Sequence, residues 1–437
     1  MKPSGGFQTK PKKEVIMALE QVFEQLLTLS RLRSSPLGHL MDDFCDSLLD
    51  QGFSRGTVRT HMGRVYHLNS WLAETGWIWE GFLRREKVDK FHKAYRKRCR
   101  PRGQKDGHLQ RNRLSINWFC RYLEQRNLLK TVACIPLYEP LLSGYLKWMK
   151  EYQHAGEGTL GVRRISIGRF LEWLGDKASP EGVGELIPSD VEGYFLDYAE
   201  RSGHAARRSM QAALRTFFRY CRHEGYTRLH LDEAVPVLRT YKLSRVPRGI
   251  EEVQSQSVLE SIDRSTPVGS RDYAILTMLH TYGVRGCQVR ALRLKDIDWA
   301  EDLILFRSAK NGKDSLLPLT EEVGVSILDY LHKGRPASDA QELFLTCRAP
   351  FHPLTNSGTL SALVKHHIDA AGIDVRAKGA HIFRHAFASR KVAQGHSFKA
   401  VADVLGHRYL STTYLYTKVD FNALKQAALE WPEEVLV

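Results

Sequence analysis

The last third of the chain carries basic, imidazole and phenol side chains whose chemistry suits a phosphate ester. They occur in the order Arg285, Lys310, His381, Arg384, His407 and Tyr416. Two guanidinium groups can each donate a pair of hydrogen bonds to one phosphate and neutralise its negative charge. A phenol, with an ordinary pKa of about 10, needs help to lose its proton before it can act as a nucleophile. An imidazole can accept such a proton, and an ammonium group can donate one to a leaving oxygen.

A metal site is the main alternative for the histidines in this set. His381 and His385 are four residues apart on a predicted helix, a spacing that can hold a metal ion. No acidic residue stands between them as it does in an HExxH motif, so we expect no metal and no other cofactor. The simpler interpretation of His385 is a packed, hydrogen-bonded side chain. Taken alone, Arg285 would be read as an ordinary surface or ion-paired arginine.

The elements that must position these residues are mostly helices. Residues 271–282 form an apolar run of helical type, and a second helical stretch covers residues 288–294. Residues 303–306 predict a strand, residues 310–313 its turn and residues 316–319 the returning strand. The C-terminal part is therefore expected to be mainly α with a small β-sheet, with the lysine on the hairpin turn.

In this order the residues resemble the tyrosine recombinases, the family of phage integrases and Xer-type resolvases. The family signature is an arginine after a glycine-containing helix end, a lysine on a β-hairpin, HxxR, LGH, and a tyrosine nine residues after the last histidine. The matching positions here are Arg285, Lys310, His381 with Arg384, His407 and Tyr416. Tyr414 and Lys313 compete with Tyr416 and Lys310; the spacing favours Tyr416, and Lys310 is preferred on the hairpin.

The resemblance implies that the protein cuts DNA strands and rejoins them through a 3′-phosphotyrosine intermediate, without ATP or metal. It implies Tyr416 as nucleophile, His381 as candidate general base and Lys310 as candidate general acid. Arg285 and Arg384 would clamp the scissile phosphate, and His407 would hydrogen-bond to it. One position departs from the family, which often has an acidic residue where this chain has Gln288. A glutamine can brace Arg285 only by hydrogen bonding.

Two stretches of the N-terminal half resemble each other. Residues 57–72 and 159–174 share helical apolar spacing and a Trp-Leu pair, and residues 119–122 match 217–220 in Phe, Arg and Tyr. The aromatic residues of both copies are expected in hydrophobic cores. With the family resemblance, this predicts two tandem helical DNA-binding domains of the SAM-like, core-binding type before the tyrosine recombinase catalytic domain.

The expected domains are residues 1–130, an N-terminal helical DNA-binding domain, and residues 131–228, the core-binding domain. Residues 229–250, with Pro236, Pro247 and alternating basic residues, predict an extended linker. Residues 251–437 form the expected catalytic domain. The segment after Tyr416 predicts a tail helix, docked on its own domain or, as in the family, on a neighbouring subunit.

Net charge is concentrated at the N-terminal end. The whole chain carries +15, and residues 1–130 alone carry +12. Such a region is suited to gripping a polyanion, since Lys and Arg can contact phosphates without reading sequence. The candidate DNA-binding residues are Arg55, Arg59, Arg64, Lys93, Arg96, Lys97, Arg98, Arg163, Arg164, Arg207, Arg208, Arg215 and Arg245.

The remaining features indicate a protein of the cytoplasm, associated with the nucleoid. No apolar run approaches the roughly 18–20 residues of a membrane span, and residues 1–13 do not resemble a signal peptide. The seven cysteines are widely spaced and lack a CxxC pair, which predicts free thiols.

The expected partner is double-stranded DNA at a specific site, with a homotetramer on two duplexes or a dimer on one site. The leading function is a recombinase or integrase of a mobile element, active in integration, excision or transposition. The alternatives are a type IB topoisomerase-like relaxing enzyme and a non-catalytic DNA-binding protein.

Overall fold

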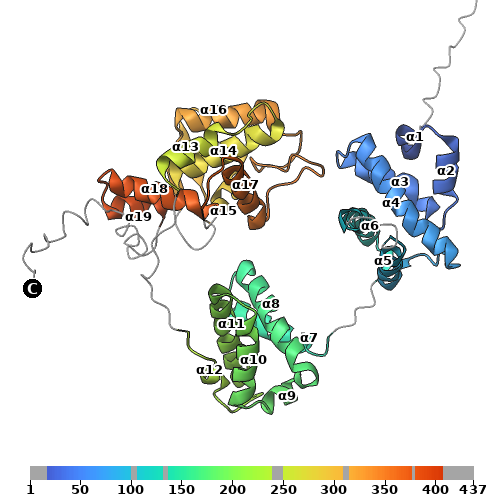
Figure 1. Cartoon of the computed structure of the whole chain (residues 1–437), viewed down its shortest axis with the longest axis horizontal. Helices are drawn as coiled ribbons and strands as arrows, with labels where there is room; N and C mark the ends of the chain where they lie inside the picture. The colour runs from blue at the N-terminus through green and yellow to red at the C-terminus, as the bar shows by residue number, and fades with distance from the viewer. Residues whose placement is uncertain are drawn as a thin grey trace, which may run out of the picture. The chain divides into compact units, whose positions relative to one another are not determined.

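The structure is a computed structural model, shown in Figure 1. It describes residues 17–99, 106–130, 136–238, 250–308, 314–375 and 379–406. Contacts divide the chain into two compact units, residues 131–242 and residues 1–130 together with 243–437. The described residues are mainly helical, with two small sheets. Within them no helix is long and apolar enough to cross a bilayer. The six cysteines among them are free, as expected.

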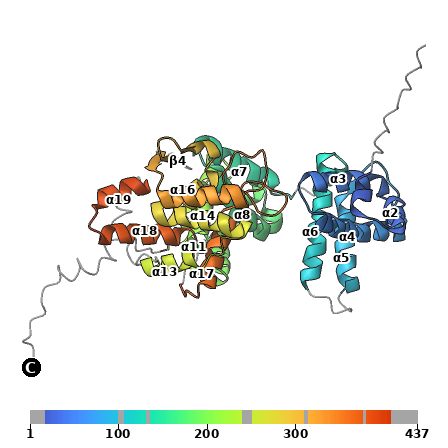
Figure 2. The same ribbon diagram turned by 90° about the horizontal axis from the view of Figure 1, so that it is seen from above.

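The N-terminal helices surround a hydrophobic cluster drawn from residues 18–123. They are α1 (Ala18–Val22), α2 (Leu26–Arg33), α3 (Met41–Asp50), α4 (Arg55–Glu74), α5 (Arg85–Cys99) and α6 (Asp106–Gln125). A two-residue strand β1 (Leu83–Arg84) pairs in parallel with β2 (Leu129–Lys130). Helices α5 and α6 run side by side (Figure 2), and the rings of Tyr95 and His108 stack between them with centroids 6.2 Å apart.

The unit of residues 131–242 has its own cluster, drawn from residues 141–235. Its helices are α7 (Glu139–Tyr152), α8 (Glu157–Leu174), α9 (Pro180–Gly184), α10 (Pro188–Glu200), α11 (His204–His223) and α12 (Leu231–Ala234). The two expected repeats are helical in both copies, at α4 and α8 and at α6 and α11. Phe119 and Phe217 are fully buried, but Trp173 is 45% exposed, so its expected place in the core is wrong. It lies at the rim of the core, where Phe170 and Tyr194 cover one side of its ring.

The segment expected to be an extended linker begins instead with structure that belongs to this unit. Leu231 in α12 and Val235 just after it are buried in the cluster. The carboxylate of Asp232 lies 3.2 Å from Arg219 and 3.2 Å from Arg222, both on α11. The prediction of extended backbone from residue 229 is therefore wrong for residues 231–234, which are helical and attached to α11 by apolar contacts and ion pairs. Residues 239–249 lie outside the described residues.

The C-terminal helices are arranged around α14 (Pro267–Tyr282), as Figure 1 shows. The others are α13 (Glu252–Glu260), α15 (Gly286–Ala291), α16 (Glu321–Asp329), α17 (Ser357–Ala370), α18 (His381–Ala393) and α19 (Phe398–Leu405). Helix α14 is apolar on most sides, which is typical of a buried helix. The Thr266 hydroxyl accepts from the backbone N–H of Gly269 at its start, Pro267 occupies the first turn, and Gly283 ends it in a left-handed conformation.

A three-stranded antiparallel sheet accompanies these helices. Strand β3 (Ile297–Asp298) pairs with β4 (Leu303–Phe306), and β4 pairs with β5 (Ser315–Pro318). Ile304 and Phe306 point into the core, and both are fully buried. The predicted hairpin of residues 303–319 is confirmed in its strands. Its turn, residues 309–313 with Lys310 and Lys313, lies outside the described residues.

Candidate active site

Arg285 occupies the turn between α14 and α15. Gly283 has φ +60° and ends α14, and a β-carbon there would lie 2.6 Å from the ring of Phe387. The backbone N–H of Arg285 donates to the side-chain oxygen of Gln288 at 3.0 Å, which caps the start of α15. Position 285 is thus fixed from both sides, by a glycine turn and by a helix cap.

Arg384 lies one turn inside α18 and is almost completely buried, with 5% of its surface exposed. Its Nη1 atom donates to the carbonyl of Gly283 at 3.0 Å, and its Nη2 atom donates to the carbonyl of Leu405 at 2.6 Å. The guanidinium therefore ties the end of α14 to the end of α19. Helix ends leave such carbonyls without donors of their own, and a cation is favoured there.

The two arginines meet at one turn. Nη2 of Arg285 donates to the carbonyl of Gly406 at 3.1 Å, next to the Leu405 carbonyl that Arg384 binds. Gly406 ends α19 in a left-handed conformation, with φ +61°. The structure thus brings Arg285 and Arg384, which are far apart in sequence, to neighbouring carbonyls of one turn. His407 follows directly, but it and Tyr416 lie outside the described residues, as do Tyr414 and the expected tail helix.

His381 begins α18, and its side chain reaches solvent. Desolvation lowers the pKa of His381 below its usual value, and the charges of Arg384 and Arg285 lower it further. The imidazole is therefore neutral at pH 7 and able to accept a proton. Desolvation also lowers the pKa of His385, with smaller contributions from His381 and Arg384.

The hairpin is anchored below its turn. Asp314 accepts a hydrogen bond from the backbone N–H of Ser308 at 2.7 Å, which closes the base of the turn. Arg307, at the end of β4, donates to the buried carboxylate of Asp296 through Nε at 3.1 Å and Nη2 at 2.6 Å. These contacts raise the pKa of Arg307, chiefly through the Asp296 hydrogen bond.

Gln288 has a role that the sequence analysis did not assign. Its side chain is buried and its oxygen contacts the backbone of Arg285, whereas the sequence analysis considered it as a brace for the arginine. The signal that could have identified this role is the position of Gln288 three residues after the helix N-cap, where a glutamine side chain can reach back.

Several candidate DNA-binding arginines are engaged within the protein. Each donates to backbone carbonyls of its own unit: Arg59 to Val22, Arg64 to Arg111, Arg163 to Ser209, Arg207 to Ser202 and Ala199, and Arg215 to Val235. Arg164 pairs with Glu139 at 2.8 Å and Arg98 with Glu74 at 3.6 Å. These contacts give the arginines a structural role that residue type alone does not reveal.

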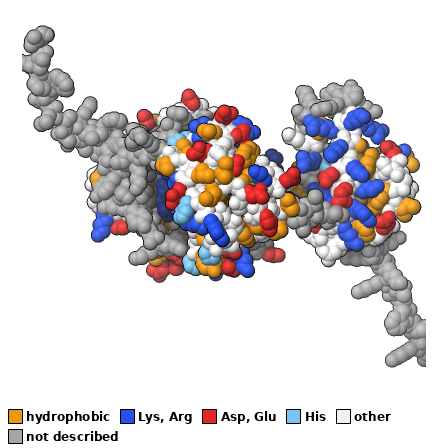
Figure 3. Space-filling model, turned by 90° about the horizontal axis from the view of Figure 1, so that it is seen from below, with side chains coloured by type: hydrophobic (Ala, Val, Ile, Leu, Met, Phe, Trp, Pro, Cys, Tyr) orange, Lys and Arg blue, Asp and Glu red, His pale blue; other side chains and the backbone are white. Residues whose placement is uncertain are grey.

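Arg59, Arg98 and Arg164 are exposed in spite of these contacts. The remaining described candidates are exposed as well, namely Arg55 at the start of α4, Lys93, Arg96 and Lys97 on α5, and Arg208 on α11. Lys and Arg side chains cover much of the visible face of the N-terminal helices (Figure 3). Arg245 lies outside the described residues.

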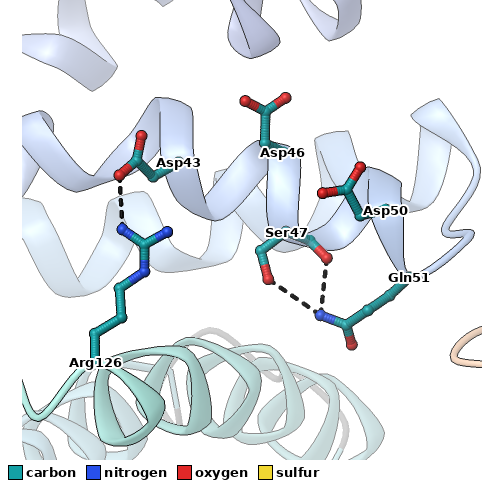
Figure 4. A pocket seen from close by; sticks show the side chains of 6 residues that line it. All are labelled: Asp43, Asp46, Ser47, Asp50, Gln51 and Arg126. Carbon is teal, nitrogen blue, oxygen red and sulfur yellow. Dashed lines mark hydrogen bonds and ion pairs between the residues drawn. The ribbon is translucent and has the colours of Figure 1, made fainter.

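One face of the N-terminal helices has the opposite charge. A pocket of about 430 Å³ is lined by Asp43, Asp46 and Asp50 of α3, with Ser47, Gln51 and Arg126 (Figure 4). Arg126 pairs with Asp43 at 2.7 Å. Desolvation, followed by the neighbouring carboxylates of Asp50 and Asp43, raises the pKa of Asp46. This face of α3 repels phosphate, so a DNA surface on these helices must lie elsewhere.

The chain is similar to known integrases and recombinases. A family model described as the phage integrase family matches residues 249–423. The putative integrase/recombinase y4rA of Sinorhizobium fredii is 31% identical over 411 residues, covering 93% of this chain and 97% of that protein. Tyrosine recombinase XerD of Yersinia pestis is 28% identical over 298 residues, covering 66% of this chain and 95% of that protein.

Among solved structures, a lambda integrase (75–356) dimer bound to a COC′ core site matches with a TM-score of 0.51 and 16% identity. The match covers 68% of this chain and 99% of that chain. At this identity the likeness shows a shared fold. The likeness to y4rA, in contrast, extends along almost the whole chain.

Proposed function

Since the chain belongs to the phage integrase family of tyrosine recombinases, we propose that it cleaves and rejoins DNA through a covalent 3′-phosphotyrosine link to Tyr416. The protein is a site-specific recombinase or integrase. The biological outcome that we propose is integration, excision or transposition of a mobile element. The proposed catalytic residues are Arg285, Lys310, His381, Arg384, His407 and Tyr416.

The observation that carries this proposal is the meeting of Arg285 and Arg384 at the turn of Leu405 and Gly406. Both guanidinium groups lie beside the residue that precedes His407, ten residues before Tyr416. Charge that is organised in advance around a phosphate is usually the largest contribution to its reactivity. An arrangement of this kind supports transesterification by a residue from the segment that follows.

In the proposed step the Tyr416 oxygen attacks phosphorus, and the bond from phosphorus to the 5′-oxygen breaks. The phenol proton passes to His381, whose lowered pKa keeps the imidazole neutral at pH 7 and so available as acceptor. Lys310 donates a proton to the leaving 5′-oxygen. The reverse reaction, with a 5′-hydroxyl as nucleophile, restores the phosphodiester. One phosphoester bond is formed for each one broken, so no external energy source is needed.

A suicide substrate tests this proposal. The substrate carries a nick beside the cleavage site of the element's end, so that the 5′-hydroxyl product diffuses away and the covalent complex accumulates. We expect a DNA-linked band from the wild type, no band from Tyr416→Phe, and retention of the band in the matched control Tyr414→Phe. Peptide mapping should place the link on Tyr416. Cleavage by Tyr416→Phe at the wild-type rate, or a link on another residue, contradicts the assignment.

The DNA contacts form a second part of the proposal. We propose that two tandem helical domains of the SAM-like, core-binding type grip the duplex, the first within residues 1–130 and the second within residues 131–228. The exposed cations of α5, namely Lys93, Arg96 and Lys97, are the proposed phosphate contacts of the first. Deletion of residues 1–130 should shorten the footprint on the target site, and an unchanged footprint contradicts this role.

Assembly on DNA completes the proposal. We propose that two copies occupy one site, as the lambda integrase dimer occupies a COC′ core site, and that four copies bring two duplexes together for strand exchange. Crosslinking of the suicide-substrate complex, followed by mass measurement, distinguishes a pair of copies from four. Recombination by an isolated single copy contradicts the assembly.

A further inference from the structure

Helix α18, which carries His381 and Arg384, is docked on the last turn of α14 by a second arginine. Nη2 of Arg390 donates to the carbonyl of His280 at 2.9 Å, while Nη1 of Arg384 donates to the carbonyl of Gly283 at 3.0 Å. The two arginines are six residues apart on α18 and bind carbonyls three residues apart on α14. Carbonyls in the last turn of a helix lack donors within the helix, and cations near them are favourable.

Arg390 also reaches a third helix. Its Nη1 atom lies 2.6 Å from both carboxylate oxygens of Glu252 at the start of α13, and 3.0 Å from Nε2 of His280. In the tautomer that accepts from Arg390, Nε2 of His280 carries no proton, and its Nδ1 donates to the Ser255 hydroxyl at 3.2 Å. Ser255 donates to the carbonyl of Glu252 at 2.8 Å, which closes a ring of hydrogen bonds.

The surroundings of this ring of hydrogen bonds favour the neutral form of the His280 imidazole. The side chain of Arg390 is 18% exposed and that of His280 is 12% exposed. Desolvation lowers the pKa of His280, and the charge of Arg390 lowers it further, against the opposing effect of Glu252. The neutral imidazole that the geometry requires is therefore the form present at neutral pH.

Between the two arginines on α18 lies Phe387, whose side chain is buried. A β-carbon at Gly283 would lie 2.6 Å from its ring, so the ring and the glycine turn are in direct contact. The guanidinium of Arg390 lies 5.7 Å from the centroid of the same ring. Residues 384, 387 and 390 thus contact the end of α14 in sequence and fix both the rotation and the axial position of α18.

We propose that Arg390 is a positioning residue for DNA cleavage: by joining α18 to α13 and α14 it holds Arg384 and His381 in place. This inference rests on the proposed function, because it assumes that Arg384 and His381 act in strand cleavage. Arg390 itself touches none of the proposed catalytic side chains through a polar contact among those described. Its effect is transmitted along α18, over about 1.7 turns to Arg384 and about 2.5 turns to His381.

The experiment compares DNA affinity with the cleavage step. Arg390→Ala, Arg390→Lys and Glu252→Gln are assayed as full-length proteins on the suicide substrate. The rate constant for covalent complex formation is measured in single turnover at saturating DNA, and Kd is measured by titration under the same conditions. Lys391→Ala is the matched control, since Lys391 is an adjacent cation that donates to Gln394 at 3.2 Å and, like Arg390, lies near the Phe387 ring, 5.9 Å from its centroid, but it has no described bond to α13 or α14.

We expect Arg390→Ala to lower the cleavage rate by about tenfold or more, since small misplacements of catalytic groups have effects of this size or larger. Its Kd should stay within about twofold, because the residue adds no proposed phosphate contact. Arg390→Lys should recover part of the cleavage rate, since lysine keeps the positive charge but lacks the several N–H donors of the planar guanidinium. Glu252→Gln should show a smaller loss, and Lys391→Ala should match the wild type.

Stability is controlled for by measuring the thermal unfolding of each variant. The competent fraction, which is the fraction of protein molecules able to form the covalent complex, is measured with excess substrate. A rate loss that is fully explained by a smaller competent fraction assigns Arg390 a structural role only and overturns the inference. Wild-type rates for both Arg390→Ala and Glu252→Gln overturn it as well. Failure of the wild type itself to form a covalent link, in contrast, refutes the proposed function and not the role of Arg390 in docking α18.

Discussion

The Nη2 atom of Arg285 donates to the carbonyl of Gly406 at 3.1 Å, across 121 positions of sequence. Gly406 is the last described residue before the segment with His407 and Tyr416. The contact places the first arginine of the predicted set next to the residue that precedes His407 in the sequence.

The two arginines of the site should differ in their effect on stability. Arg384→Ala removes a buried guanidinium and leaves the carbonyls of Gly283 and Leu405 without its bonds, so we expect a loss of about 2–4 kcal/mol. Arg285→Ala removes one bond from a half-exposed side chain, so we expect about 1 kcal/mol or less. Urea unfolding of the two variants measures this difference, and both should lose strand cleavage. Equal losses of stability would contradict the structural role of Arg384.

Replacing Gly283 should disturb α18 through a direct clash. Gly283→Ala puts a β-carbon 2.6 Å from the Phe387 ring at a residue with φ +60°. Backbone strain of about 1–2 kcal/mol should then add to overpacking of about 1–3 kcal/mol. Gly395→Ala is the matched control, since Gly395 has φ +82° but nothing within 4 Å of the new atom. Thermal unfolding should show the larger loss for Gly283→Ala, and comparable losses would rule out the clash.

Gln288 should tolerate a carboxylate better than an apolar side chain. Gln288→Glu keeps an oxygen that can accept from the backbone N–H of Arg285, and it adds a negative charge near that guanidinium. Gln288→Ala loses the helix cap, at a cost of about 1 kcal/mol. We expect cleavage to survive in Gln288→Glu and stability to fall in Gln288→Ala, as measured by suicide-substrate trapping and thermal unfolding. Unchanged stability in Gln288→Ala would show that this hydrogen bond does not stabilise the start of α15.

Substitutions of free-standing and of hydrogen-bonded cations on the N-terminal helices should change the salt dependence of DNA affinity differently. Lys93→Ala and Lys97→Ala should each reduce the slope of log K against log salt by about 0.9, since each removes one phosphate contact. Arg59→Ala should leave the slope unchanged and lower stability, because Arg59 donates to the carbonyl of Val22 at 2.6 Å. DNA titrations at several salt concentrations measure both effects. An unchanged slope in both lysine variants would place the DNA surface elsewhere.

The N-terminal helices should lose stability in mild acid because His61 is buried. Its Nδ1 lies 3.0 Å from the Ser115 hydroxyl, and desolvation, followed by the charge of Arg64, lowers the pKa of His61 to about 4. The folded pKa is below the unfolded one, so the stability is complete above about pH 6.5 and is lost as pH falls towards 4. The loss should reach about 3 kcal/mol at most.

Hydrogen exchange of the amides of α4 measures this pH dependence. His61→Gln should weaken the dependence without abolishing it, because burial also lowers the pKa of His67 and His92 in the same helices. If His61→Gln showed the same pH dependence as the wild type, the pKa of His61 would be the same in the folded and unfolded states, contrary to the prediction.

The sequence by itself determined the family, the order of the candidate catalytic residues and most of the C-terminal elements. Helix α14 could be predicted because a long apolar run bounded by Pro267 and Gly283 is typical of a buried helix. The strands of the hairpin could be predicted because two short apolar runs flank a polar turn. Local patterns of this kind depend on neighbouring residues, which the sequence displays directly.

Only the tertiary structure decided which polar side chains are engaged. Arg59 and Arg208 are both exposed arginines, yet Arg59 donates to the carbonyl of Val22 on another helix. The half-buried Arg163 and Arg215 donate in the same way to the carbonyls of Ser209 and Val235. The pairing of Arg285 with Gly406, and of Arg390 with Glu252 and His280, joins positions more than 100 residues apart. Such contacts depend on how helices pack, and side-chain type and spacing carry no information about a partner on a distant helix.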